Sequence, residues 1–235
     1  MRVDKFLSEM GIATRSESAR AAKRGEISVD GIVIKKADIH IDPEKNAVCY
    51  RGSLVKYEKY IYVMLNKPDG YVSATEDGRE KVVTELLPDE IRARDVFPCG
   101  RLDKHTTGLM LITDNGELSH RLLAPKSHVK KRYRYSSKFP LSESDKNRLE
   151  CGTVLDDGYE TKPSEIELDE GRDSGIITLT EGKYHQIKRM FESVGNKITE
   201  LERISFGPLT LDASLSRGEW RYLTEEEIKM LESHK

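Results

Sequence analysis

The stretch "CGRLDKHTTGLMLITDNG", residues 99–116, places one acidic side chain between two bases, directly ahead of an apolar run. The apolar segment 108–113 is short and is bounded by glycine and by Asp-Asn-Gly, which is typical of a buried strand. We therefore expect Asp103 to lie on a loop that enters a rigid core strand. Such a loop can position a reacting group precisely. The alternative for an acid between Arg101 and Lys104 is a surface ion pair.

The length and composition of the chain allow two domains. The chain has 235 residues, of which 37% are hydrophobic, and this is enough for a sizeable core. We find neither a run of roughly 18 apolar residues nor the apolar segment of a signal peptide, so we expect a cytoplasmic protein without a membrane partner. Three widely spaced cysteines and histidines without ligand spacing predict neither disulfides nor a metal site.

Charge is unevenly distributed along the chain, although the formal net charge is only −2. Residues 118–142 contain seven bases and no acid, with Tyr133 and Tyr135 among them. Residues 143–173 carry eleven acids and four bases. Aromatic rings among cations can stack nucleic-acid bases between phosphate contacts, so the basic block is a candidate RNA surface. A solvated protein face is the alternative for either block.

The first sixty residues predict two helices followed by a hairpin. Apolar residues at helical spacing indicate a helix over 3–10. Thr14 or Ser16 can cap a second helix, and Gly25 can end it. The Asp-Gly dipeptide at 30–31 lies within an alternating apolar and polar segment, which is a strong hairpin signal.

The segment "RVDKFLSEMGIATRSESARAAKRGEISVDGIVIKKADIHI", residues 2–41, resembles the S4 RNA-binding module. The resemblance implies an αL-type module, in which a helical hairpin on a small sheet presents polar side chains to structured RNA. These side chains are Arg15, Ser16, Arg20, Lys23 and Arg24. Favourable helix-end charges are the alternative for the cations. The module indicates that the partner is RNA, but it does not indicate an activity. We expect it to span residues 1–58.

The remaining residues, 59–235, predict a second domain of alternating short strands and helices. A buried strand over 60–65 runs into a Pro-Gly turn, and Asp114 is the predicted N-cap of a helix after the core strand. The other predicted elements are a short helix and a strand within 84–100, strands within 174–182 and 203–211, and helices over 183–194 and 224–233.

Three motifs of this second domain resemble one enzyme family. "GRLDKHTTGLMLIT", residues 100–113, resembles the signature G-R-L-D-x-x-T-[ST]-G-L-L-L-L-T of pseudouridine synthases of the RsuA type. "VMLNKPDGYV", residues 63–72, and the stretch 181–211 resemble that branch's other motifs. The resemblance implies a mixed α/β (α+β) fold with a largely antiparallel, curved sheet. It also implies an isomerase that converts uridine to pseudouridine without a metal or an organic cofactor.

The resemblance makes Asp103 the catalytic carboxylate. A carboxylate can add covalently to the substrate or remove a ribose proton to give a glycal, and both routes stay open. The target base must first leave its stack, and Arg101 is implied to fill the vacated space, with a salt bridge to Asp103 as the alternative. Tyr133 is implied to lie against the uracil. Tyr135, on the same strand face, is the alternative, and core packing is an alternative for both.

Basic side chains complete the site that the resemblance implies. Lys188 is expected to pair with Asp103 and to orient its carboxylate. Arg189, Lys130 and Lys131 are expected to contact RNA. His185 and Gln186 are either RNA contacts or ordinary loop residues. His105 stands where the family often has an acid, so a supporting role at that position is left open.

The residues of two later motifs indicate which RNA is the substrate. "HQIKR", residues 185–189, and "GEWRYLTEEE", residues 218–227, resemble the small-subunit branch of the family. The implied substrate is a uridine of 16S rRNA, free or in a small-subunit assembly particle, modified by a monomer. Large-subunit rRNA is the alternative substrate. A non-catalytic ribosome-assembly factor is the alternative from another class, and the presence of Asp103 argues against it.

Overall fold

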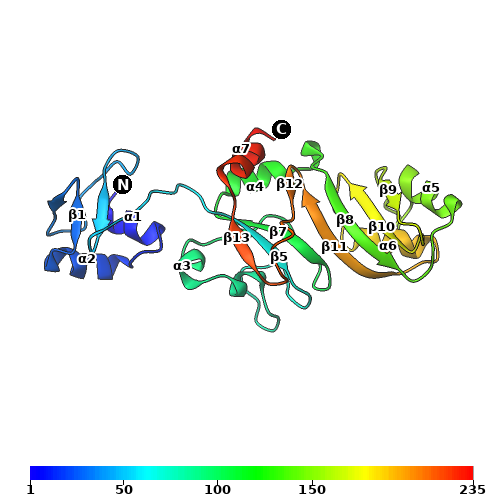
Figure 1. The fold of residues 1–235 in the computed structure, drawn as a ribbon, viewed down its shortest axis with the longest axis horizontal. Coiled ribbons are helices and arrows are strands. Elements are labelled where there is room, and N and C mark those ends of the chain that lie inside the picture. The colour runs from blue at the N-terminus through cyan, green and yellow to red at the C-terminus, as the bar shows by residue number, and fades with distance from the viewer. Residues whose placement is uncertain (235) are drawn as a thin grey trace. The chain divides into compact units, whose positions relative to one another are not determined.

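The computed structural model describes residues 1–234, which form two compact units (Figure 1). One unit comprises Met1–Ile61 together with Leu87–Val96, and the other comprises Tyr62–Leu86 and the chain from Phe97 onward. The chain thus passes between units close to the boundary that we expected at 58–59. The return of Leu87–Val96 to the first unit had no signal in the sequence.

The first unit packs two helices against a small antiparallel sheet. Thr14 caps the second helix, because its hydroxyl accepts from the Glu17 amide at 3.3 Å and the Glu17 carboxylate accepts from the Thr14 amide at 2.8 Å. Gly25 ends this helix in the left-handed conformation, as predicted. The elements are α1 (Val3–Glu9), α2 (Arg15–Arg24), β1 (Ile27–Val29), β2 (Ile32–Val33), β3 (Val48–Tyr50) and β4 (Ser53–Leu54), with the strands in the order β2-β1-β3-β4.

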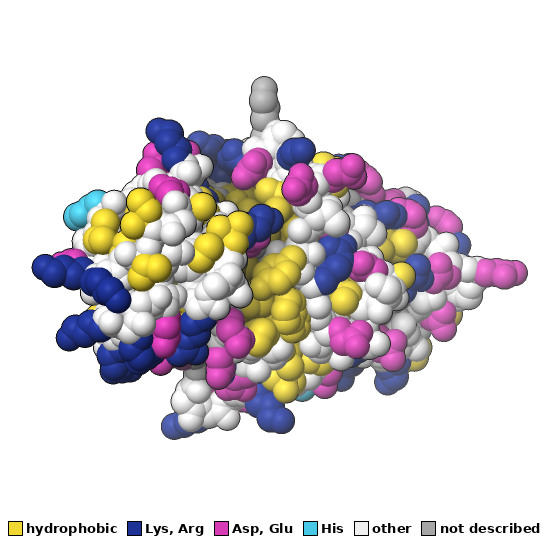
Figure 2. All heavy atoms as spheres, turned by 60° about the vertical axis from the view of Figure 1, so that its left-hand side comes forward, with side chains coloured by type: hydrophobic (Ala, Val, Ile, Leu, Met, Phe, Trp, Pro, Cys, Tyr) yellow, Lys and Arg dark blue, Asp and Glu magenta, His cyan; other side chains and the backbone are white. Residues whose placement is uncertain are grey.

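The exposed face of α2 carries the polar residues that the sequence analysis selected. Ala21 and Ala22 face a core that includes Phe6, Leu7 and Ile27, and burial of each large apolar side chain there stabilises the unit by about 1.5–3 kcal/mol. The residues left on the solvent side are Arg15, Ser16, Arg20, Lys23 and Arg24. Lysine and arginine side chains gather along the lower left of the first unit in Figure 2.

The second unit is built on one large, curved sheet in the order β13-β5-β7-β11-β8-β10-β9 (Figure 1). Strand pairing is antiparallel except between β7 and β11, where it is parallel, so the predicted fold class is confirmed. The strands are β5 (Tyr62–Lys67), β6 (Phe97–Pro98), β7 (Thr107–Thr113), β8 (Lys131–Ser137), β9 (Glu165–Leu168), β10 (Ser174–Leu179), β11 (Ile198–Phe206), β12 (Leu209–Thr210) and β13 (Trp220–Tyr222). The α-helices are α4 (Gly116–Leu123), α5 (Glu143–Cys151), α6 (Gln186–Ser193) and α7 (Glu225–Ser233).

Strand β7 is the predicted core strand, and a glycine allows its parallel pairing. Leu109, Met110, Leu111 and Ile112 are fully buried. Gly108 has φ +99°, and a Cβ atom there would lie 2.3 Å from the backbone oxygen of β11. A larger residue would therefore separate β7 from β11. This close approach holds the loop that precedes β7 against the centre of the sheet.

Two local predictions were wrong in detail, whereas the short helix and the strand predicted within 84–100 are present as α3 (Asp89–Arg92) and β6. The N-cap of α4 is Asn115 and not Asp114, because the Asn115 carboxamide accepts from the Leu118 amide at 3.0 Å and also donates to the Tyr62 hydroxyl at 2.9 Å. The helix predicted over 183–194 begins only at Gln186, since the preceding residue is left-handed. A 3₁₀ turn (Val83–Leu86) precedes α3, and Pro88 separates the two.

Candidate active site

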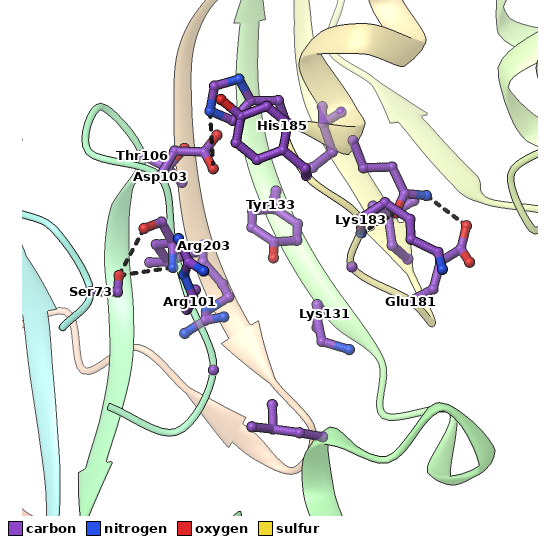
Figure 3. Close-up of a pocket in the computed structure, with 18 of the residues that line it drawn as sticks. Ser73, Arg101, Asp103, Thr106, Lys131, Tyr133, Glu181, Lys183, His185 and Arg203 are labelled. Atoms are coloured by element: carbon purple, nitrogen blue, oxygen red, sulfur yellow. Dashed lines mark hydrogen bonds and ion pairs between the residues drawn. The ribbon is translucent and has the colours of Figure 1, made fainter. Parts of the chain in front are cut away.

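A cavity of about 940 Å³ lies in the second unit, and the Asp103 loop lines it (Figure 3). Strand β8, the segment that leads into α6, and strand β11 supply the other walls. Asp103 lies on the loop between β6 and β7, as predicted. The cavity therefore brings together residues from the three motifs that the sequence analysis quoted.

Hydrogen bonds from the side chains of Ser73 and Lys67 hold the backbone of the Asp103 loop. The Ser73 hydroxyl accepts from the Leu102 amide at 2.9 Å and donates to the Leu102 carbonyl at 2.7 Å. The fully buried Lys67 ammonium donates to three carbonyls, those of Pro68, Lys104 and Thr106, at 3.1, 3.0 and 2.8 Å. Burial lowers the pKa of Lys67 to about 8. These bonds fix the backbone on both sides of the carboxylate.

The Asp103 carboxylate faces two groups from the start of α6. The Lys188 ammonium lies 3.1 Å from Oδ2, and both side chains are 26% exposed. The His185 Nε2 atom lies 3.6 Å from Oδ1. The His185 ring also stacks on the exposed Tyr184 ring, with 3.9 Å between centroids. The structure thus places Lys188 beside Asp103, as the sequence analysis expected, and adds His185 to the same carboxylate.

The structure distinguishes the two tyrosines of β8. Tyr133 lines the cavity and lies between the Asp103 loop and Lys183 in Figure 3. Tyr135 is 1% exposed and packs edge-on against the Phe191 ring, at 4.9 Å between centroids. Burial raises the pKa of Tyr135 to about 12, and its hydroxyl has no hydrogen-bond partner among residues 1–234. Only Tyr133 of this pair can therefore face a base in the cavity.

The basic block is divided by the alternation of β8. Lys130 pairs with Glu165 at 3.0 Å, and Arg132 pairs with Glu167 at 2.8 Å. These acids belong to β9 and to the acidic block, so the two charge blocks face one another across β10. Lys131 points to the other face and lines the cavity. Lys130 and Arg132 are thus neutralised by acids of the protein, whereas Lys131 forms no ion pair among residues 1–234.

The remaining predicted RNA contacts lie in different surroundings. Arg101 is exposed, lines the cavity, and makes no ion pair with Asp103 among residues 1–234. Arg189 is bound by both Asp156 and Asp157, which leaves its guanidinium less available to a phosphate than we expected. His105 is exposed and lies 2.9 Å from the Asp69 carboxylate.

The sequence analysis missed three supporting residues, Lys67, Ser73 and Arg203. Arg203 is 1% exposed, and its Nε atom donates to the Leu109 carbonyl of β7 at 2.8 Å. The one available signal was the lysine at the end of β5, a strand with an apolar start, because a lysine is rarely buried without a function or a partner.

Within residues 1–234, no group of three or more His, Cys, Asp or Glu side chains is arranged to hold a metal ion. No helix of this part of the chain is long and apolar enough to cross a membrane.

Comparison with known proteins supplies independent evidence. The family model for RNA pseudouridylate synthase matches residues 61–193, and the model for the S4 domain matches residues 1–45. The chain is 44% identical, over 98% of each sequence, to an uncharacterized RNA pseudouridine synthase, YtzG, of Bacillus subtilis (strain 168). It is 40% identical to ribosomal small subunit pseudouridine synthase A of Vibrio cholerae, over 97% of this chain and 98% of the relative. A solved pseudouridylate synthase is 35% identical and superimposes with a TM-score of 0.69, over 98% of this chain and 99% of that one.

Proposed function

The chain belongs to the RNA pseudouridylate synthase family, and from this premise we propose that it converts a uridine of small-subunit rRNA to pseudouridine, with Asp103 as the catalytic carboxylate. The observation that carries the assignment of Asp103 is its pairing with Lys188 inside the cavity. The small-subunit substrate rests on relatives that carry that substrate in their names. The finer proposal is a 16S rRNA uridine equivalent to position 516.

The reaction breaks the N1–C1′ bond of uridine and forms a C5–C1′ bond. The uracil turns between these two events, the C5 proton leaves, and N1 ends protonated. No atom is gained or lost, so the site needs to hold the base and to assist bond cleavage and proton movement. Asp103 supports this chemistry either by adding to the substrate or by taking a ribose proton.

The neighbours of Asp103 have roles that their positions support. Lys188 orients the carboxylate and balances its charge at 3.1 Å. Tyr133 offers a ring face to the extruded uracil, and the hydroxyl lies on the cavity side. Arg101 is exposed at the cavity and is suited to fill the stack that the base leaves. Lys67 and Ser73 are positioning residues, because they contact only the backbone of the Asp103 loop.

The first unit supplies an RNA-binding surface of its own. Arg15, Arg20 and Lys23 are exposed on α2, and none of them forms an ion pair within the described chain. Arg24 is bound by Glu26, which leaves it a smaller share in phosphate binding. We propose that α2 binds structured rRNA while the cavity takes one uridine, and that the protein acts as a monomer in the cytoplasm.

Mapping pseudouridines in rRNA tests this function. The purified protein is incubated with unmodified 16S rRNA, with a partly assembled small subunit, and with 23S rRNA, and pseudouridine is mapped by mass spectrometry after selective derivatisation with a carbodiimide, because pseudouridine and uridine have the same mass. We expect one modified uridine in the small-subunit samples only. Modification of 23S rRNA alone would show that large-subunit rRNA is the substrate. Absence of pseudouridine in all three samples would contradict the function.

A further inference from the structure

Arg203 and Lys131 line the cavity, and neither has a carboxylate partner among residues 1–234. Arg203 of β11 is 1% exposed, and it donates to the Leu109 carbonyl at 2.8 Å and to the Met110 sulfur at 3.8 Å. Lys131 of β8 is half-buried, and its ammonium donates to the Val129 carbonyl at 2.9 Å. Neither side chain forms an ion pair among residues 1–234. Both line the cavity (Figure 3).

These two cations lie on the same aromatic ring. The Arg203 guanidinium is 5.0 Å from the centroid of the Phe206 ring, and the Lys131 ammonium is 5.9 Å from it. The ring attracts each cation through its quadrupole, but it does not neutralise a charge. Burial and then the neighbouring Arg203 lower the pKa of Lys131 to about 8. Lys131 is thus held close to a like charge inside the protein.

Two carboxylates near this pair, one beside Arg203 in the sequence and one at the cavity, already have other partners. Glu202, beside Arg203 on β11, pairs with Arg217 at 2.9 Å. Glu181, also at the cavity, accepts from the Tyr159 hydroxyl at 2.7 Å, from a backbone amide at 2.9 Å and from the Gln186 carboxamide at 2.8 Å. Neither acid lies within ion-pair distance of Lys131 or Arg203. The protein itself therefore leaves the pair uncompensated.

The cations on either side of Lys131 in the chain differ from it in having carboxylate partners. Lys130 and Arg132, the neighbours of Lys131 in the chain, each have a glutamate on β9. Buried cations are ordinarily paired, since an unpaired charge in the interior costs several kcal/mol. A positive pair that is retained inside a cavity points to an anion that enters from outside.

We infer that Lys131 and Arg203 form a phosphate-binding subsite that holds a backbone phosphate of the extruded nucleotide. The inference rests on the proposed function, because in an RNA substrate the anions are phosphates. Lys131 and Tyr133 are two residues apart on one face of β8, so their side chains are separated by about 6.5–7 Å. Figure 3 shows Tyr133 between Asp103 and Lys131. A uracil against Tyr133 can therefore have its own phosphate at Lys131.

The first test uses inorganic phosphate and the full-length protein. Its melting temperature is measured with increasing phosphate, at an ionic strength kept constant with chloride, for wild type, Lys131→Gln and the matched control Lys130→Gln. We expect phosphate to raise the melting temperature of wild type and of the control, and to have at least tenfold weaker effect on Lys131→Gln. Equal responses of wild type and Lys131→Gln would overturn the subsite. Lys131→Arg should restore the response.

The second test distinguishes free phosphate from RNA phosphate. Substrate RNA carries one neutral methylphosphonate at each phosphate flanking the target uridine in turn, and single-turnover rates and affinities are measured. We expect one replacement to weaken wild type by roughly 10–100-fold, as loss of a charge-assisted bond does. With natural RNA, the Lys131→Gln variant should already have a lower rate or affinity than wild type. The methylphosphonate at that phosphate should cause no further loss in this variant. If the effects of the Lys131→Gln substitution and of the methylphosphonate were fully additive at every phosphate position, the result would contradict a contact between Lys131 and an RNA phosphate.

These tests separate the subsite from the proposed function. Wild-type turnover of unmodified RNA reports on the function, whereas the phosphate titration needs no turnover. Arg203→Lys and Arg203→Gln are added as variants of the second cation. Because Arg203 is buried and holds β7, a loss of folding in either variant leaves Lys131→Gln to decide the outcome.

Discussion

Substitution of Asp103 by asparagine separates a catalytic carboxylate from a structural ion pair. The carboxamide is nearly isosteric, so the change removes the charge that faces Lys188 at 3.1 Å and His185 at 3.6 Å. Since Asp103 and Lys188 are each 26% exposed, solvent screens their attraction, and we expect a loss of about 0–1 kcal/mol of stability. In a unit of this size that is a decrease of at most about 2–4 °C in melting temperature.

The effect of Asp103→Asn on turnover should be far larger. A group that acts in the transition state lowers the rate by about 10⁴–10⁶-fold when it is removed, with little change in affinity. The assay is release of tritium from C5-labelled uridine under single-turnover conditions, with filter binding of the same RNA. Asp69→Asn is the matched control, because its carboxylate is exposed and pairs with His105 at 2.9 Å on the neighbouring loop. The control should react at the wild-type rate, and an Asp103→Asn protein that does so would refute the assignment.

Substitutions at five further residues test neighbouring parts of the site and the S4 surface. Tyr133→Leu should lower the single-turnover rate at least tenfold because it removes the ring that faces the base, and Tyr133→Phe tests the hydroxyl separately. Lys188→Gln should lower that rate by roughly 10–100-fold at nearly constant RNA affinity, and Lys188→Arg should restore most of it; an unchanged rate in the glutamine variant would exclude the orienting role. Arg20→Gln and Lys23→Gln should each reduce the log–log salt slope of RNA binding by about 0.7–0.9, whereas an unaltered slope would place the RNA elsewhere. Because the folded-state pKa of Lys67 is about 8 and its ordinary value is 10.5, the unfolded state holds more protons between these values, and the free energy of unfolding should rise with pH there. Urea unfolding of Lys67→Met should show a smaller rise, and an identical pH profile would contradict the burial of its charge.

Local chemistry explains what the sequence could predict. Thr14 with Glu17 and the Asp-Gly turn at 30–31 are short-range signals, and both produced the expected cap and hairpin. The cluster of Asp103, Tyr133 and Lys188 was available only through resemblance, since 85 residues separate the first from the last in the sequence numbering. Their convergence depends on how β7, β8 and α6 are placed by one sheet.

The residues that sequence analysis missed depend on contacts between distant strands. Lys67 ends β5 and supports a loop that follows β6, and no local pattern indicates which carbonyls it will meet. Arg203 becomes a cavity residue because Gly108 permits the parallel pairing of β7 with β11. The choice of Asn115 over Asp114 as a helix cap likewise depended on the distant Tyr62 hydroxyl. Non-local pairing, and not propensity, decided each of these positions.

The same non-local pairing explains how a chain with a net charge of −2 can present a positive site to RNA. The net charge of the protein determines its electric field only at distances beyond a Debye length, which is about 8–10 Å. RNA binding depends instead on the individual charges that lie within reach of a phosphate. An acid of β9 neutralises an outward cation of β8, as Arg132 with Glu167 shows, so this cation contributes little to attraction. Lys131, on the inward face of the same strand, has no such acid within ion-pair distance among residues 1–234. The alternation of one strand therefore directs the charge of Lys131 into the cavity that we propose as the substrate site.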